Sequence, residues 1–298
     1  MATTTGQATP TRAPRTLRVV EQPQHALRRA VRRYRTFRGT VPAAHPPACP
    51  PGWAVGPPDW VGVGVQKGGT SWWHRMIATH PEMSQADGLS KELHFFDRYF
   101  DTEFSDADAA AYTSFFPRPP GGMSGEWTPR YLFDFWVPPL LARAAPQAKV
   151  LVLLRDPVER YRSGLSHEVD TGSTSSPVLA QETMQRGLYA AQLTRLLSCF
   201  PREQVLVLQY ERCRAEPQTQ LARTFSFLGL RDATFAPPTV AEVVNRSRSA
   251  KAALPAHVRE QLVTAYSADI AVLRGIVPDL DLRLWPNFAH LTSATEPA

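Results

Sequence analysis

Three short and almost entirely apolar runs mark strands along this chain. They are residues 60–65 (WVGVGV), 149–154 (KVLVLL) and 205–209 (VLVLQ). Each run has the length of a strand and lacks the alternation of polar and apolar positions that a half-buried strand shows. Strands buried on both faces are typical of parallel sheets. The runs therefore predict a central parallel sheet.

Helical patterns accompany these strands. They cover residues 70–80, 218–228 and 254–276, and the first of them ends at Pro81. After the second apolar run, Asp156 can cap a helix in which Pro157 takes the first position. Strands that alternate with helices predict an α/β fold, with helices flanking the sheet on both faces.

The first 58 residues differ in composition from the rest. Residues 1–24 are rich in Thr, Pro, Ala and Arg, which favours a disordered tail. Residues 25–39 (HALRRAVRRYRTFRG) form a basic amphipathic pattern, which suits either peripheral contact with an anionic membrane or packing on the protein's own domain. Proline-rich residues follow as a linker up to position 58, so residues 59–298 are predicted to form one globular domain.

Composition narrows the class of protein. The 298 residues carry a formal net charge of +6, which favours anionic ligands, although such a charge also simply aids solubility. Three scattered cysteines predict neither a disulfide framework nor a zinc site. No apolar run approaches the roughly 20 residues of a membrane span, and the N-terminus lacks a signal-peptide core. We therefore expect a cytoplasmic protein, with peripheral membrane contact through residues 25–39 as an open alternative.

A glycine loop after the first strand is the clearest candidate for chemistry. Residues 61–76 read VGVGVQKGGTSWWHRM, in which a strand passes through a loop into a helix N-terminus. Such a loop binds phosphate through main-chain N–H groups and the helix dipole. Gly68 and Gly69 permit close approach, Thr70 and Ser71 add hydroxyl donors, and Lys67 adds a positive charge. The Gly-x-x-x-x-Gly-Lys-Ser/Thr string of nucleoside triphosphatases does not occur.

Several motifs together resemble one family. The segment QKGGTSWW (66–73) resembles the 5′-phosphosulfate-binding loop of sulfotransferases that use 3′-phosphoadenosine-5′-phosphosulfate (PAPS). LRDPVERYRSG (154–164) resembles that family's 3′-phosphate motif, and KELHFFD (91–97) is similar to the catalytic-base segment of its heparan-sulfate branch. RGLY (186–189) and FLGL (227–230) also match that branch. The motifs keep the family's order, and their combination is more specific than any one of them.

The resemblance implies a role for individual residues. Glu92 would be the general base, Lys67 would stabilise the leaving group, and His94 would orient the acceptor or assist the proton transfer. The residues implied in binding PAPS are Lys67, Gly68, Gly69, Thr70, Ser71 and Trp72 in the loop, Arg155 and Ser163 at the 3′-phosphate, and Arg246, Ser247 and Arg248 nearer the C-terminus. We expect no metal, because a sulfuryl group carries less charge than a phosphoryl group.

The family resemblance says less about the acceptor than about the donor PAPS. The acceptor is expected to offer a hydroxyl on a glycan, a glycolipid or a natural product. In GEWTPRYL (125–132), Trp127 stands where the heparan-sulfate branch usually has a lysine, which argues against a heparan-like acceptor. Trp127 and Arg130 are the candidate acceptor contacts.

Other interpretations stay open at this stage. Taken singly, Glu92 could be a surface partner of Lys91, His94 a packed histidine, and Trp72 a core residue. For the whole chain, the rivals are an ATP- or GTP-dependent kinase and a non-enzymatic protein that binds anions or lipid through residues 25–39. Basic and aromatic residues are too scattered for a nucleic-acid surface. The sequence does not predict an oligomeric state.

Overall fold

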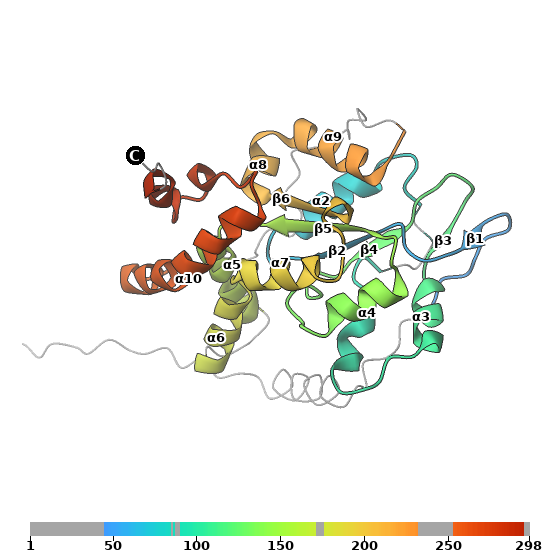
Figure 1. Ribbon diagram of the computed structural model, residues 1–298, viewed down its shortest axis with the longest axis horizontal. Coiled ribbons are helices and arrows are strands. Elements are labelled where there is room, and N and C mark those ends of the chain that lie inside the picture. Colours follow the sequence, from blue (N-terminus) through green and yellow to red (C-terminus); the bar gives the residue numbers. More distant parts are fainter. Residues whose placement is uncertain (1–44, 85, 87–89, 171–175, 232–252, 295–298) are drawn as a thin grey trace, which may run out of the picture.

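The computed structural model describes residues 45–84, 86, 90–170, 176–231 and 253–294 (Figure 1). The tail and most of the basic helix-and-linker segment predicted before residue 59 lie outside the described residues. The same is true of the predicted PAPS contacts Arg246, Ser247 and Arg248.

A four-stranded parallel sheet forms the centre of the protein. Its strands, in spatial order, are β4 (Gly125–Trp127), β2 (Trp60–Gly64), β5 (Lys149–Leu154) and β6 (Val205–Gln209). The prediction of a parallel sheet is confirmed, and three of the strands agree with the apolar runs. The edge strand β4 was not predicted, because three residues are too few to show a pattern. A separate antiparallel pair joins β1 (Ala54–Val55) to β3 (Pro117–Arg118).

The helices begin and end close to their predicted bounds. The predicted helices appear as α2 (Thr70–Ala78), α9 (Pro217–Leu228) and α10 (Ala256–Ile276). The Asp156 carboxylate accepts hydrogen bonds from the main-chain N–H groups of Val158, at 2.9 Å, and Glu159, at 3.2 Å, and so caps α5 (Pro157–Asp170) as predicted. The other helices are α3 (Asp106–Thr113), α4 (Val137–Ala144), α6 (Pro177–Gln185), α7 (Tyr189–Leu197) and α8 (Tyr210–Ala215). Short 3₁₀ helices cover Phe95–Phe100 (η1), Arg202–Gln204 (η2), Leu282–Leu284 (η3) and Ala289–Ala294 (η4).

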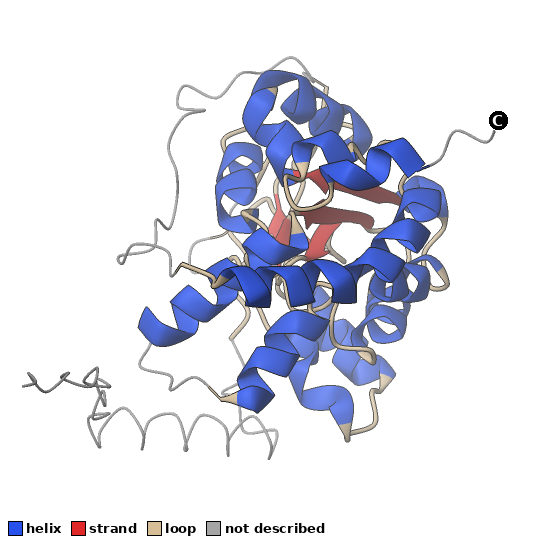
Figure 2. Cartoon of the chain, turned by 90° about the vertical axis from the view of Figure 1, so that its left-hand side faces the viewer, coloured by secondary structure: helices blue, strands red, loops and turns tan. Residues whose placement is uncertain are grey.

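Helices cover both faces of the sheet, as predicted. Successive residues of a strand point to opposite faces. On β5, Val150 and Val152 belong to the core shared with α4, α7 and α10, whereas Leu151 and Leu153 belong to the core shared with α2 and α9. Figure 1 shows α2 and α9 on one side of the strands and α4 and α7 on the other, and Figure 2 shows the strands enclosed by helices. The strands are apolar throughout because both faces are buried.

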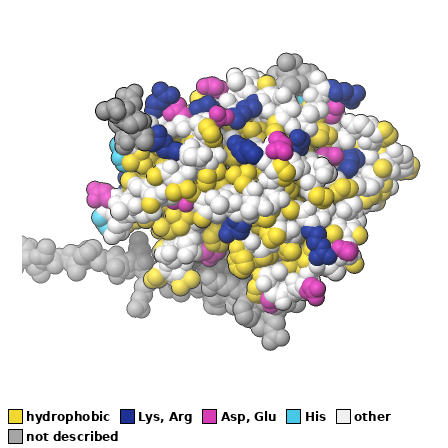
Figure 3. Space-filling model, viewed as in Figure 1, with side chains coloured by type: hydrophobic (Ala, Val, Ile, Leu, Met, Phe, Trp, Pro, Cys, Tyr) yellow, Lys and Arg dark blue, Asp and Glu magenta, His cyan; other side chains and the backbone are white. Residues whose placement is uncertain are grey.

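The surface carries both signs of charge. On the face in Figure 3, basic and acidic side chains lie interspersed. Among the described residues, several arginines are ion-paired. Arg143 lies 2.6 Å from Asp106, and Arg223 lies 2.7 Å from Asp279. The positive net charge therefore forms no single patch on this face. None of the helices described here combines the length and the apolar character needed to cross a bilayer.

Gly62 on β2 allows the sheet to pack against Trp127. A Cβ atom at Gly62 would lie 2.1 Å from the Trp127 ring, and both residues are in the core of the sheet. We expect Gly62→Ala to lower the free energy of unfolding by about 1–3 kcal/mol, because the core must shift to accept the methyl group. Urea denaturation measures this change.

Gly275→Ala is the matched control for this substitution. Gly275 lies in α10, and apart from its chain neighbours and the backbone of its own helix no atom lies within 4 Å of its would-be Cβ. This variant is expected to be as stable as the wild type or slightly more stable, since Ala favours a helix by roughly 0.5–1 kcal/mol over Gly. Equal stability of the Gly62→Ala variant and the wild type would contradict the packing described here.

Candidate active site

The glycine loop joins β2 to α2 through a tight turn. The N–H of Val65 donates to the carbonyl of Leu153 on β5 at 3.2 Å, and the N–H of Gly68 donates to the carbonyl of Val65 at 2.9 Å. A Cβ at Gly68 would lie 2.6 Å from the Leu153 oxygen, and Gly69 has a φ of 92°. Both positions therefore require glycine. The turn leads directly into the N-terminus of α2, the arrangement that favours an anion.

Tyr210 aligns this loop with the neighbouring strand ends. It is the first residue of α8, directly after β6, and a Cβ at Gly69 would meet its ring at 2.5 Å. The guanidinium of Arg155 lies 5.0 Å from the centre of the same ring, and Trp72 meets it edge-on at 6.1 Å. Tyr210 was not predicted as a site residue. Its contacts come from segments far apart in sequence, so no motif marks it.

The two predicted phosphate motifs lie side by side. Arg155, directly after β5, donates from Nη1 to the carbonyl oxygen of Lys67 at 3.1 Å. Tyr189 holds the same segment by donating its hydroxyl to the carbonyl of Arg155 at 2.8 Å. Ser163 is half-buried on α5, in the helix that Arg155 precedes. The carboxyl ends of β2 and β5 thus bring together the loop and a cation able to grip a second phosphate.

Trp72, in the first turn of α2, is a buried residue. Its side chain is 4% exposed, and the guanidinium of Arg214 lies 5.5 Å from its ring. The ring therefore belongs mainly to the core shared with α9. The predicted contact of Trp72 with PAPS stays a prediction.

Glu92 and His94 form one charged cluster with Asp97. His94 Nε2 lies 3.4 Å from Glu92 Oε2, and His94 Nδ1 lies 2.9 Å from Asp97 Oδ2. The hydrogen bond to Asp97 and that to Glu92 raise the pKa of His94 to about 9, against the effect of burial. Because this pKa is raised, the imidazolium persists through neutral pH and is lost only as the pH rises through about 9. His94 therefore bridges two carboxylates as a cation.

Lys91 links this cluster to the glycine loop. Its Nζ lies 2.8 Å from Glu92 Oε1, 3.3 Å from Thr70 Oγ1 and 3.2 Å from Ser71 Oγ. The ion pair between Lys91 and Glu92, which a purely structural interpretation predicts, is therefore present. The same ammonium group also contacts the glycine loop. Burial raises the pKa of Glu92, yet the hydrogen bond from His94 and the charge and hydrogen bond of Lys91 lower it to about 2.

A buried carboxylate, Glu126 on β4, anchors the segment that carries Glu92 and His94. Glu126 is fully buried, and its Oε2 accepts from the N–H of Leu93 at 3.2 Å. The same oxygen accepts from the Thr128 hydroxyl at 2.5 Å, and that hydroxyl accepts from the N–H of His94 at 3.3 Å. The hydroxyl of Tyr131, which also hydrogen-bonds to Glu126, accepts from the N–H of Phe95 at 2.8 Å.

Three consecutive main-chain N–H groups are thus satisfied by one buried cluster. Tyr112 also contacts Glu126, because its hydroxyl donates to Glu126 Oε1 at 2.9 Å. Burial raises the pKa of Glu126, and the hydrogen bonds it accepts oppose that rise. The cluster fixes the backbone at His94, which has a φ of 53°, a conformation uncommon for a residue other than glycine.

Of the two predicted acceptor contacts, Trp127 is instead a core residue. It is 0% exposed, and its Nε1 donates to the carbonyl of Gly64 at 3.2 Å. It follows Glu126 on a strand, so its side chain points to the opposite face. Arg130 is half-buried and pairs with Asp134 at 2.6 Å. Arg130 is also close enough to Asp97 for that carboxylate to help raise its pKa, against burial.

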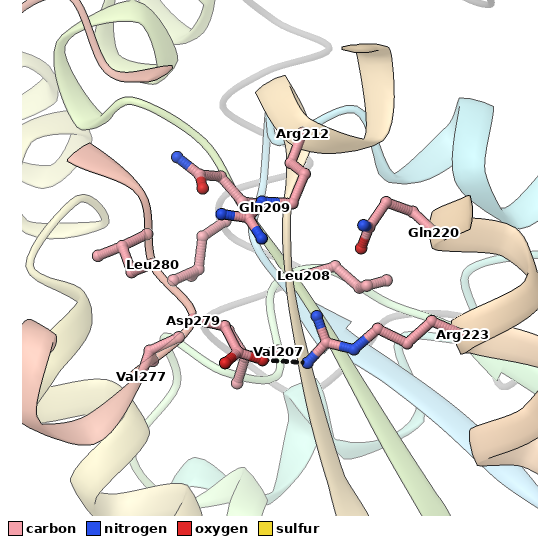
Figure 4. Close-up of a pocket in the computed structure, with 10 residues that line it drawn as sticks. Val207, Leu208, Gln209, Arg212, Gln220, Arg223, Val277, Asp279 and Leu280 are labelled. Atoms are coloured by element: carbon pink, nitrogen blue, oxygen red, sulfur yellow. Dashed lines mark hydrogen bonds and ion pairs between the residues drawn. The ribbon is translucent and has the colours of Figure 1, made fainter. Parts of the chain in front are cut away.

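A small pocket along β6 lies outside this cluster (Figure 4). Its interior volume is about 10 Å³, room for a single water molecule. Arg223 and Asp279 line it and are paired with each other at 2.7 Å. Within the described residues, no group of three or more His, Cys, Asp or Glu side chains could hold a metal ion.

The fold and the site define a class of protein. A parallel sheet carries a glycine loop at its carboxyl edge, with an arginine from the next strand and a carboxylate–imidazolium cluster beside the loop. These features are typical of α/β proteins with an anion site at a strand-to-helix loop, and they favour a phosphate-bearing ligand there.

Comparison with known proteins gives the family. The chain belongs to the family with a sulfotransferase domain, whose model matches residues 57–251. It is 31% identical over 189 residues to human heparan sulfate glucosamine 3-O-sulfotransferase 3B1, over 58% of this chain and 46% of the human protein. It is 32% identical over 183 residues to human heparan sulfate glucosamine 3-O-sulfotransferase 6, over 57% of this chain and 51% of that protein. The chain thus spans about half the length of these relatives.

A solved structure agrees with this membership. A sulfotransferase from Alicyclobacillus acidocaldarius superposes with a TM-score of 0.63 at 28% identity, over 76% of this chain and 98% of that one. The resemblance seen in the sequence motifs is therefore confirmed at the level of the family and the fold. Family membership favours the sulfotransferase interpretation over the kinase and the non-enzymatic alternatives.

Removal of the Thr128 hydroxyl tests whether the Glu126 cluster positions His94. Thr128→Val removes this hydroxyl, which leaves the N–H of His94 without its acceptor. We expect the pKa of His94 to fall from about 9 toward its ordinary value of 6.5, because the imidazole loses its fixed place between Glu92 and Asp97. Proton NMR titration of the imidazole measures this pKa.

Thr128→Ser is the matched control, since it keeps the hydroxyl in the same position. It should restore the wild-type titration of His94. An unchanged pKa of His94 in a folded Thr128→Val protein would show that the buried cluster does not position the imidazole.

Proposed function

We propose that this protein transfers a sulfuryl group from PAPS to a hydroxyl group of an acceptor, with Glu92 as general base. The observation that best supports this proposal is the spacing between base and loop. A single side chain, Lys91, spans from the Glu92 carboxylate to the hydroxyls of Thr70 and Ser71. A sulfuryl group held by the loop would therefore lie next to the base.

The donor suits the cation and amide groups at this edge of the sheet. Main-chain N–H groups of the loop and the hydroxyls of Thr70 and Ser71 would bind the 5′-phosphosulfate. Arg155, with its fork of donors, and Ser163 would bind the 3′-phosphate, the group that distinguishes PAPS from ATP. The contact between Arg155 and the carbonyl of Lys67 supports this pairing, since it joins the two phosphate motifs.

The chemistry requires one proton transfer and one in-line displacement. Glu92 accepts the proton of the acceptor hydroxyl while that oxygen forms a bond to sulfur. The bond from sulfur to the bridging oxygen of the donor breaks, and the electron pair stays on adenosine 3′,5′-bisphosphate (PAP). Lys67 stabilises the negative charge that develops on this oxygen. Asp97 holds His94 beside Glu92, where the imidazolium can orient the acceptor.

The acceptor belongs to a broad class. The human relatives named above are heparan sulfate glucosamine 3-O-sulfotransferases, which supports a hydroxyl of a glycan. We retain a glycolipid or a natural product as acceptors, and Arg130 as the flanking contact because of its interaction with Asp97. Trp127 is left out of the acceptor site because it is buried.

Glu92→Gln tests the general base. We expect it to lower the turnover of sulfuryl transfer by about 10²–10⁴-fold, because the amide cannot accept the hydroxyl proton. The affinity for PAP should stay nearly the same. Mass spectrometry of candidate acceptors incubated with PAPS measures transfer through the gain of roughly 80 Da for each sulfuryl group.

Glu203→Gln makes the same chemical change on η2, before β6 and at the opposite end of the strands. This control should transfer as the wild type does. Wild-type turnover by the Glu92→Gln protein would assign the base to another residue.

A further inference from the structure

Lys91 contacts both halves of the proposed reaction centre through hydrogen bonds at Nζ, to Glu92 on one side and to Thr70 and Ser71 on the other. An ammonium group has three donors and no acceptor. Its three contacts therefore make Thr70 and Ser71 acceptors toward Lys91. Each hydroxyl keeps its own proton free to donate, as binding of an anion requires.

We propose that Lys91 is a second catalytic lysine. In the free protein its ammonium group bonds to Glu92; with the donor in place it transfers that bond to a sulfuryl oxygen and releases the Glu92 carboxylate to act as base. The inference rests on the proposed function, because it takes the loop as the place of the sulfuryl group. Lys91 would thus stabilise negative charge on the sulfuryl group, and it would release Glu92 only when the donor is bound.

The main chain at Lys91 is fixed, so the change is one of side-chain orientation. The N–H of Trp127 on β4 donates to the carbonyl of Lys91 at 2.7 Å, and the next residues are held by the Glu126 cluster. The Lys91 side chain is 20% exposed, so it is not fully enclosed by the protein. A long, unbranched side chain on a rigid backbone can redirect its donors over a short distance.

The charges around Lys91 and Glu92 favour such a transfer. Glu92 faces Lys91 and His94, whereas Lys91 faces Glu92 and interacts with the charge of Glu126. The charge of Lys91 also acts on His74 and helps to lower its pKa. Burial lowers the pKa of Lys91 more than these carboxylates raise it, and burial lowers the pKa of His74 to about 4, so that His74 is neutral. A sulfuryl oxygen would give the partly desolvated ammonium another anionic partner.

The loss of this contact would make Glu92 a stronger base. With Lys91 and His94 bonded to it, Glu92 has a pKa of about 2 and a weak affinity for protons. Removal of the Lys91 contact leaves burial, which raises this pKa, opposed by His94 alone. The free protein therefore keeps its base inactive, and binding of the donor activates it.

Lys91→Met tests the proposal, with Lys149→Met as the matched control. Lys149 begins β5 at the amino end of the sheet, where its Nζ lies over the ring of Phe227. Two measurements are made on each full-length protein. The first is the pKa of Glu92 without ligand, from ¹³C NMR of the labelled carboxyl. The second is the release of sulfate from PAPS with water as acceptor, together with the affinity for PAP.

In Lys91→Met we expect the pKa of Glu92 to rise toward its ordinary value, and sulfate release at saturating PAPS to fall by about 10²-fold, typical of the loss of one donor to a transition state. Affinity for PAP, which lacks the sulfuryl group, should stay nearly unchanged. Lys149→Met should match the wild type in all three measurements.

Two results would overturn the proposal. One is an unchanged pKa of Glu92, and the other is a loss of PAP affinity as large as the loss of rate, which would make Lys91 only a support for the loop. The proposed function would fail separately, if the wild type transferred no sulfuryl group to any of the candidate acceptors. The titration of Glu92 in the free protein would still decide whether Lys91 holds the carboxylate.

Discussion

The site depends on one buried carboxylate that organises a loop it does not belong to. Glu126 on β4 has no exposed surface, and directly or through the hydroxyls of Thr128 and Tyr131 it serves the N–H groups of three successive residues, 93 to 95. A buried carboxylate is costly unless it is hydrogen-bonded. Here those bonds offset the cost of burying Glu126. They also hold in place the segment that carries Glu92 and His94.

The parallel sheet supplies the second constraint, because its strands end at one edge. The glycine loop follows β2, Arg155 follows β5 and Tyr210 follows β6. Contacts between neighbouring strand ends then place the glycine loop beside the guanidinium of Arg155, with Tyr210 packed against both. The edge strand β4 contributes the buried anchor. Each of the four strands thus positions a different part of the site.

The sequence predicted the features that depend on local patterns. Apolar runs gave β5 and β6, and the glycine loop and the Asp156–Pro157 cap were recognised because a few adjacent residues determine them. Residues whose role depends on contacts between distant segments were missed. Lys91 reads as a surface partner of Glu92 until the fold brings Thr70 and Ser71 to it. Trp127 was misplaced because three residues of β4 gave too little pattern to tell its face.

A crystal structure of the protein with PAP tests the arrangement of the site most directly. The 5′-phosphate is predicted to lie within hydrogen-bond distance of the main-chain N–H groups of the glycine loop, and the 3′-phosphate to contact Arg155 and Ser163. PAP bound away from the loop, or a 3′-phosphate without contact to Arg155, would contradict the assignment of this edge of the sheet as the donor site.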